Sequence, residues 1–565
     1  MMRYIAMVAL LFSWSDWVFS QPNIQSARIG FSMKVQVDNR GVFGRQAFPG
    51  GDPPQSSGLI GMEYPAGEPY EHLFGTGVWI GGILDTARSG PPVYHRGVSV
   101  VYEGWSGPHF EFNPGDSPAD TIFRISGGKN PPKPAAWDEH FGVGYPFRPI
   151  TDDLPYENFF MKYSDVHSRR VAGHVPMNLR IIEACYAWSN PYADAIMIVE
   201  YTIVNFGRKI IDSAYVGFFY EADVGPISAP LYWTRNFTGY YPNSRTGYVH
   251  NPVDRGSTPS GVALLSTSKS LDSLRYSFNW FPGPQTPPDD RGKYALMSSG
   301  NIRRDEFPSL SDTRFVFSFG PFFIKPSGAD RDTVRYPRGD TLKIAVAILS
   351  GYDPAGNHLR ALQRNASRAL DIYLNQGIQL PKTPPSPPLR IEVGFRKVTL
   401  NWRWTPADSV GPNGRKNPEL NWDSTNQVSR RYPDRIDPPF EPGVDPLRGG
   451  RNFSAYKIWR SEHPGTFNFF TNKWDPPPDN SYTLIRQIDV PTDSFEYNIG
   501  RGPGPNGEYH FDGLQPDTFV DSNLVRGNVY WYAVTSKSIP NLAYQQIVIG
   551  GQVVTVEVPV DPLES

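Results

Sequence analysis

The residues that come closest to a chemical site are two acids, Glu221 and Asp223, at the end of an apolar, strand-like run. Side chains alternate along an extended chain, so both carboxylates are expected to point to the same side. Calcium takes about six to eight oxygen ligands, including backbone carbonyls, which makes this loop a candidate Ca²⁺ site. The competing interpretation is a solvated strand end. We expect no other cofactor.

Aromatic side chains in loops are the second set of candidates. Trp and Tyr stack on sugar rings and are frequent in protein interfaces, and this chain has 14 Trp and 30 Tyr. Five of them lie in turn-rich segments and are candidate ligand contacts: Trp233, Tyr240, Tyr241, Trp422 and Trp474. For each of the five, packing in the core or within a loop is the competing interpretation.

No motif points to catalysis, and we expect neither catalytic residues nor an enzyme. The ten histidines show no HExxH spacing, and no GxSxG sequence is present. The Gly-rich segment 502–507 contains two prolines, which lack the backbone amides that a phosphate-binding loop needs. Glycoside hydrolysis requires two carboxylates across a cleft, and no local pattern singles out such a pair among 56 acids.

Composition favours a β-rich chain of several packed units. At 565 residues the chain exceeds one hydrophobic core, and 57 Pro with 53 Gly suit many short strands joined by turns. With 54 basic and 56 acidic residues the net charge is only -2, which argues against a nucleic-acid partner. The fold class we predict is all-β, built from large antiparallel sandwiches.

Residues 1–20 are typical of a secretory signal peptide, with Arg3, an apolar stretch from Tyr4 to Trp14, and Ser20 before a cleavage site. The alternative is a membrane anchor, but the stretch is shorter than the roughly 20 residues that span a bilayer. We therefore expect a secreted or cell-surface protein with no membrane span after cleavage. Cys185 is the only cysteine, which excludes an internal disulfide and, within an aromatic strand, suits a small buried side chain.

The strongest strand signals lie between residues 178 and 224. Apolar residues alternate with period two over 179–188, 195–204 and 210–220, which predicts three strands of an antiparallel meander. Both faces of the middle strand are apolar, so we expect it to be covered on both sides. Further alternating runs at 274–280, 315–319 and 342–348 are expected to complete the same sandwich.

One long helix is predicted from Pro354 to about Asn375, with Asp353 as its N-cap. Its apolar residues recur at spacings of three and four, so it should lie on a sheet and end the first region. This region spans 21–379, as one domain or as two subdomains, 21–165 and 166–379. The Pro-rich segment 380–388 is predicted to be an extended linker.

The C-terminal unit, 389–562, resembles the fibronectin type III domain. The run Lys397-Val-Thr-Leu-Asn-Trp402 is similar to that family's strand B, whose Trp is buried. The spacing from Leu524 to Tyr530 is similar to its tyrosine corner, in which the Tyr hydroxyl bonds back to the upstream backbone. This chain departs from the family in length, because long insertions follow Pro406 and Gly500.

Several segments together resemble a family of large bacterial exported proteins, most of which have no assigned activity. They include Val199-Glu-Tyr-Thr-Ile-Val-Asn205 and Tyr215-Val-Gly-Phe-Phe-Tyr-Glu-Ala-Asp-Val-Gly225. The resemblance implies a β-sandwich, a helix, a Pro-rich linker and a fibronectin type III domain. From it and from the exposed aromatics we expect a non-catalytic structural or adhesive protein whose partners are other surface or extracellular proteins or glycans. The alternatives are a carbohydrate-binding protein, with or without calcium, and a polysaccharide-degrading enzyme on a β-sandwich.

Overall fold

The computed structural model describes most of the chain between residues 24 and 559. The described residues are 24–85, 91–104, 110–115, 120–126, 132–147, 155, 157–167, 174–190, 192–303, 310–327, 341–374, 378, 380, 389–402, 453–463, 465–468, 473–475, 477, 481–489, 508–509, 518–538, 542–549 and 552–559. The predicted signal peptide, Trp422 and most of the predicted linker lie outside these residues.

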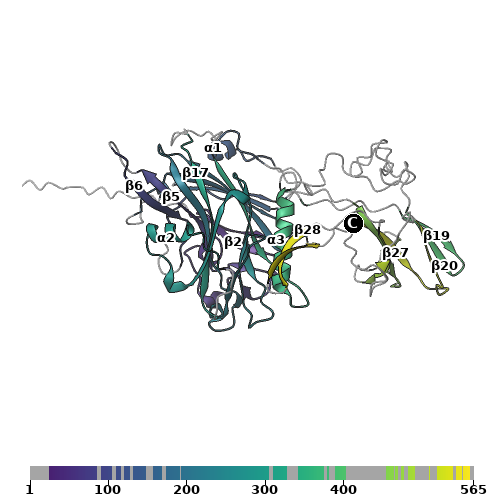
Figure 1. Cartoon of the computed structure of the whole chain (residues 1–565). Helices are drawn as coiled ribbons and strands as arrows, with labels where there is room; N and C mark the ends of the chain where they lie inside the picture. The colour runs from purple at the N-terminus through teal and green to yellow at the C-terminus, as the bar shows by residue number, and fades with distance from the viewer. Residues whose placement is uncertain are drawn as a thin grey trace, which may run out of the picture.

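The chain is all-β, and its N-terminal region is built on two large antiparallel sheets (Figure 1). The first has eight strands, in the order β13 (Phe237–Tyr241), β14 (Thr246–His250), β15 (Ser260–Thr267), β18 (Leu342–Ser350), β10 (Ile196–Asn205), β9 (Leu179–Ala187), β8 (Glu157–Ser164) and β7 (Phe123–Ser126). The second has five, in the order β16 (Arg275–Pro282), β17 (Thr313–Ile324), β11 (Ile211–Glu221), β5 (Gly75–Asp85) and β6 (Tyr94–Val100).

Smaller elements complete this region. Strands β1 (Ser26–Gly30), β2 (Lys34–Asp38) and β3 (Met62–Glu63) form one small sheet, and β4 (Tyr70–Glu71) pairs with β12 (Gly225–Pro226). The described α-helices are α1 (Trp137–Phe141), α2 (Asp290–Met297) and α3 (His358–Leu374). Strands from both sides of residue 165 share both large sheets, so the two segments 21–165 and 166–379 are interleaved.

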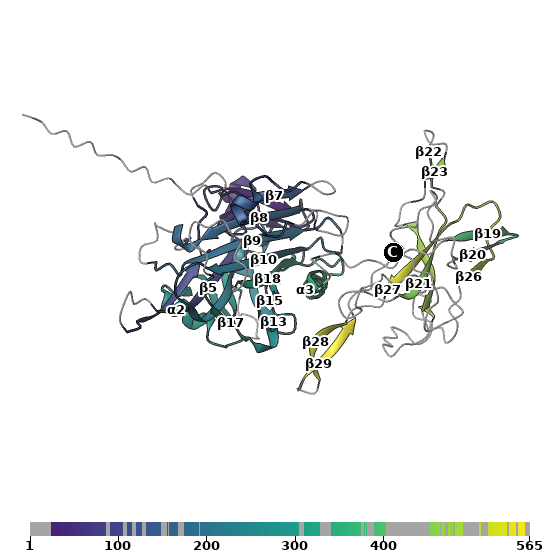
Figure 2. The same ribbon diagram turned by 90° about the horizontal axis from the view of Figure 1, so that it is seen from above.

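The main core lies between the two sheets. Alternate residues of β10 face β11, where the rings of Tyr201 and Phe218 have centroids 5.6 Å apart. The opposite face of β10, with Ile196 and Ile198, joins a second core that includes the apolar stripe of α3. Both faces of this strand are therefore covered, as its sequence predicts. Figure 2 shows α3 lying along the eight-stranded sheet.

Two predictions about elements need correction, and one helix was missed. The strands of 179–220 form as expected, but β11 belongs to the five-stranded sheet, so the three do not make a meander. The turn after Asn205, whose side chain accepts from the Gly207 amide at 2.9 Å and donates to the Lys209 carbonyl at 2.8 Å, carries the chain to the other sheet. Helix α3 begins at His358 rather than Pro354, because Asp353 accepts from the Ala355 amide in a separate turn. Helix α2 was not predicted.

The C-terminal unit has two further sheets. One has the order β19 (Arg390–Gly394), β20 (Lys397–Asn401) and β26 (Thr518–Ser522), and the other β25 (Glu508–Tyr509), β24 (Thr483–Asp489), β21 (Phe453–Ser461) and β27 (Trp531–Ser538). Two hairpins belong to neither of these sheets. They are β22 (Thr466–Asn468) with β23 (Lys473–Asp475), and β28 (Leu542–Ile549) with β29 (Gln552–Pro559).

A small core holds the C-terminal unit together. Trp402 is fully buried there, with Leu400, Ile458 and Val534 in the same cluster. The Tyr530 hydroxyl accepts a hydrogen bond from the Val525 amide at 3.0 Å, the local contact expected from the Leu524 to Tyr530 spacing. Among the described residues, no helix has the length and apolar character needed to cross a membrane.

Candidate functional site

The side chain of Glu221, the first of the two predicted metal ligands, is buried and bound by other side chains of the protein. It is the last residue of β11 and lies opposite Arg314 of β17 in the strand register. The two side chains form an ion pair, and they are 4% and 5% exposed. The Tyr102 hydroxyl donates a second hydrogen bond to the Glu221 carboxylate at 2.7 Å. Both carboxylate oxygens of Glu221 therefore have partners.

Burial is the main influence on the pKa of the Glu221 carboxyl. It raises the pKa of Glu221 to about 7, and the neighbouring Arg314 guanidinium opposes the shift. Arg314 also lies 3.5 Å from the half-exposed carboxylate of Asp312. One buried cation thus balances two acids, and the balance depends on keeping that cation in place.

Asp223, the second predicted ligand, is buried without a direct partner among the described residues. Its exposed fraction is 9%. The following residue is fixed, because the Val224 amide donates to Asn236 at 2.8 Å and its carbonyl accepts from Asn251 at 3.0 Å. Burial, followed by the negative charges of Asp312 and Glu221, raises the pKa of Asp223 well above its usual range.

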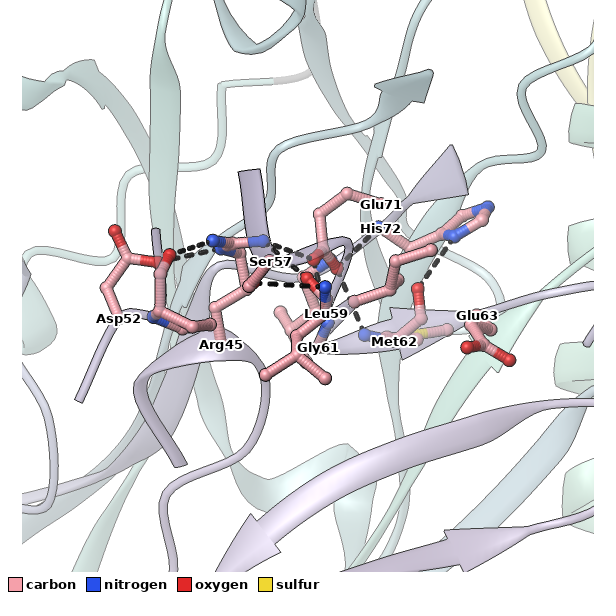
Figure 3. A network of polar contacts seen from close by, with 12 residues as sticks. Arg45, Asp52, Ser57, Leu59, Gly61, Met62, Glu63, Glu71 and His72 are labelled. Atoms are coloured by element: carbon pink, nitrogen blue, oxygen red, sulfur yellow. Dashed lines mark hydrogen bonds and ion pairs between the residues drawn. The ribbon is translucent and has the colours of Figure 1, made fainter. Parts of the chain in front are cut away.

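A second arginine and glutamate lie next to this strand end, because β12 pairs with β4 and brings Glu71 opposite Gly225. Figure 3 shows the contacts of this pair. Arg45 donates to Asp52 at 2.7 Å and to the Leu59 carbonyl at 2.7 Å, and it lies 3.7 Å from Glu71. Glu71 is fully buried and accepts four backbone amides, those of Gly61, Met62, His72 and Leu73.

These contacts explain why the loop before β3 needs a glycine at position 61. A Cβ there would lie 2.2 Å from the Arg45 amide nitrogen and 2.6 Å from the Leu73 carbonyl oxygen. The backbone therefore approaches closely enough for Glu71 to bind the loop. His72 is also buried, with Nδ1 2.9 Å from the Met62 carbonyl, and burial lowers its pKa to about 4. The contacts of Glu71 and His72 therefore hold the loop around Gly61 in place.

We define the acid cluster as the carboxylates and arginines that meet at the end of β11: Asp52, Glu71, Glu221, Asp223, Asp312, Arg45 and Arg314. It holds more acids than cations, and Asp223 is the member that no described residue pairs directly. Even so, the described residues contain no group of three or more His, Cys, Asp or Glu side chains arranged to hold a metal ion. A cation at Asp223 would have to rely largely on backbone oxygens or water.

The sequence could not find Arg45, Glu71 and Arg314 as members of the acid cluster. All three are far along the chain from Glu221: strand register brings Arg314 and Glu71 near it, and Arg45 lies 3.7 Å from Glu71. The only local signal was the close spacing of Glu221 and Asp223 itself.

A second buried ionic network lies under α2. The Lys293 ammonium pairs with Glu103, both largely buried, and lies over the ring of Trp79, 5.8 Å from its centroid. Nearby, His174 Nδ1 is 3.2 Å from the Glu111 carboxylate, and that carboxylate raises the pKa of His174 against the opposing effect of burial. These groups too are bound to one another within the fold.

Of the five aromatic candidates, the structure describes the side chains of Tyr240, Tyr241 and Trp233, and none of these three is fully exposed. Tyr240 is 5% exposed and stacks on Phe278, with ring centroids 4.8 Å apart. Tyr241 is half-buried and stacks on Tyr248, and half-buried Trp233 meets the edge of Tyr232. Trp474 lies in β23, and Trp422 lies outside the described residues. Packing accounts for Tyr240 and Tyr241.

Cys185 is buried, as its aromatic strand predicts. Its thiol lies 3.5 Å from Glu183, which is fully buried and also accepts a hydrogen bond from the Tyr163 hydroxyl. Burial raises the pKa of the Cys185 thiol well above its usual range, which disfavours the thiolate that nucleophilic chemistry needs.

Comparison with known proteins gives no family for this chain, because no family model matches it and no curated protein shows significant similarity to it.

Proposed function

We propose that this chain is a non-catalytic exported protein with a structural or adhesive role at the bacterial surface or in the extracellular space. The signal-like residues 1–20 support export, and the resemblance of 389–562 to a fibronectin type III domain supports a modular surface protein. Binding would then use loops on a rigid β scaffold rather than a reactive pocket.

The observation that carries the proposal is the burial of both candidate acids together with the internal pairing of Glu221. The pKa of Glu221 and that of Asp223 are raised, as in many catalytic acids, but burial is the main cause in both. Both residues are less than 10% exposed, and Glu221 already binds Arg314 and Tyr102. A buried carboxylate held by internal partners serves the fold, whereas a general acid must reach a substrate.

One observation favours a second candidate, a carbohydrate-binding protein that uses calcium. Asp223 is a buried carboxylate with no direct described partner, in a cluster with excess negative charge. A bound cation would balance that charge and favour the ionised carboxylate.

The test is a glycan array and a reducing-sugar assay on the mature chain from Gln21, with Asp223→Asn as the matched control. We expect no glycan above background and no sugar released from polysaccharides, for either protein. Binding of one glycan class that Asp223→Asn abolishes would instead support the second candidate. Material recovered outside the cells should begin near Gln21, and an intracellular chain that keeps Met1 would contradict export.

A further inference from the structure

Two turns of the C-terminal unit form an apolar tip. The turn after β19 and the loop after β26 are joined by the Leu524 amide, which donates to the Arg396 carbonyl at 3.1 Å, and by the Arg396 side chain, which reaches the Leu524 carbonyl at 3.4 Å. We call residues 393–397 and 525–529 the tip. Figure 2 shows the β19–β20 hairpin at the outer end of its unit.

The tip carries the two most exposed large hydrophobic side chains among the described residues. Val393 is 83% and Phe395 82% exposed, the two highest values among the large hydrophobic side chains, while Val525 and Val529 are 58% and 52% exposed. Neighbouring exposed apolar side chains on a stable fold usually mark a binding surface.

The charged residues of the tip indicate which kind of partner this surface would bind. The tip also carries exposed Arg396, Lys397 and Arg526, and it contains no Asp or Glu. The nearest acid in sequence is Glu392, which precedes Val393 on β19 and therefore points to the opposite face of the strand. Exposed apolar side chains next to exposed cations match the interface of an anionic bilayer, where apolar side chains enter the acyl boundary and cations remain at the headgroups.

We propose that the tip is a peripheral membrane-binding surface for anionic lipid. A convex pair of short turns suits insertion into a bilayer better than a protein interface, which needs roughly 800 Å² on each partner. Such a surface would hold an exported chain at a membrane without a transmembrane segment. This inference rests on the proposed function only for the location of the protein outside the cell. Binding to vesicles in vitro does not depend on export.

The test is co-sedimentation of the mature chain with vesicles of phosphatidylcholine alone and of phosphatidylcholine with phosphatidylglycerol at about 3:1. We expect binding to the anionic vesicles, weakened by salt. Phe395→Ser should reduce the partition coefficient about tenfold, and Lys397→Gln with Arg526→Gln should remove the preference for phosphatidylglycerol. Phe323→Ser changes a phenylalanine that is 54% exposed on β17 and is the matched control, expected to bind as the unmodified chain does.

Three results would overturn the proposal. They are no sedimentation with either vesicle, equal binding by the Phe395→Ser variant, or equal loss in the Phe323→Ser control. Binding of the tip to a protein in place of lipid would give the first result. Because the substituted side chains are exposed, all variants should keep the melting curve of the unmodified chain.

Discussion

Replacing Arg314 by methionine is expected to lower the free energy of unfolding by about 3 kcal/mol at pH 8, because a buried acid loses its cation. Arg314 is 5% exposed and balances both Glu221 and Asp312. Methionine keeps most of the side-chain volume, so the change isolates the charge. Urea unfolding followed by tryptophan fluorescence gives the free energy directly.

The pH dependence of this loss separates charge from packing. Glu221 can take up a proton once Arg314 is gone, so the penalty should shrink clearly at pH 5. The double variant Arg314→Met with Glu221→Gln should recover part of the stability, since glutamine can still accept from the Tyr102 hydroxyl. A penalty below about 1 kcal/mol at pH 8 would mean that the pair behaves as a surface ion pair and contributes little to the fold.

Replacing Glu183 by glutamine is expected to remove a large pH-dependent contribution to the free energy of unfolding. Burial raises the pKa of Glu183 to about 8, and the nearby charge of Asp38 adds to the shift. A carboxyl whose folded pKa is raised stabilises the fold fully below the unfolded pKa, and this stability is lost as pH rises to the folded pKa. From pH 4.5 to 8 the wild-type chain should therefore lose about 5 kcal/mol through this group.

The Glu183→Gln variant should lack this loss of stability with rising pH, because glutamine does not titrate. Its side chain can still accept a hydrogen bond from the Tyr163 hydroxyl. Relative to wild type it should become progressively more stable as pH rises, which urea midpoints between pH 5 and 8 would show. Glu200→Gln is the matched control, because Glu200 also accepts from a tyrosine, Tyr186, at 2.9 Å but is only half-buried. Parallel curves for Glu183→Gln and wild type would contradict the prediction.

Local sequence pattern predicted the long central strands of the two large sheets but not their partners. Alternation located β9, β10 and β11 to within one residue. It could not place β11 in the other sheet, because β10 pairs with β18 from a distant part of the chain, and such pairings depend on packing rather than on spacing. The same limit applies to the acid cluster, where register, not local sequence, brings Arg314 to Glu221.

Helix α2 was missed although it carried a usable signal. Asp289 is its N-cap and accepts from the Gly292 amide at 2.7 Å, a contact that an Asp before a short amphipathic run can indicate. Two prolines precede the helix and a glycine lies inside it, features that are more typical of a loop. The start of α3 shows the opposite error, because Asp353 with Pro354 suits a helix start but forms a turn.

Whether Glu221 and Asp223 serve the fold or a cation is decided most directly by the melting temperature of the mature chain in chelator and in calcium. Because both acids belong to the internal acid cluster, the two melting temperatures should agree within about 1 °C at about 5 mM calcium. A rise of several degrees in calcium that is absent from Asp223→Asn would contradict this and place a cation at the end of β11.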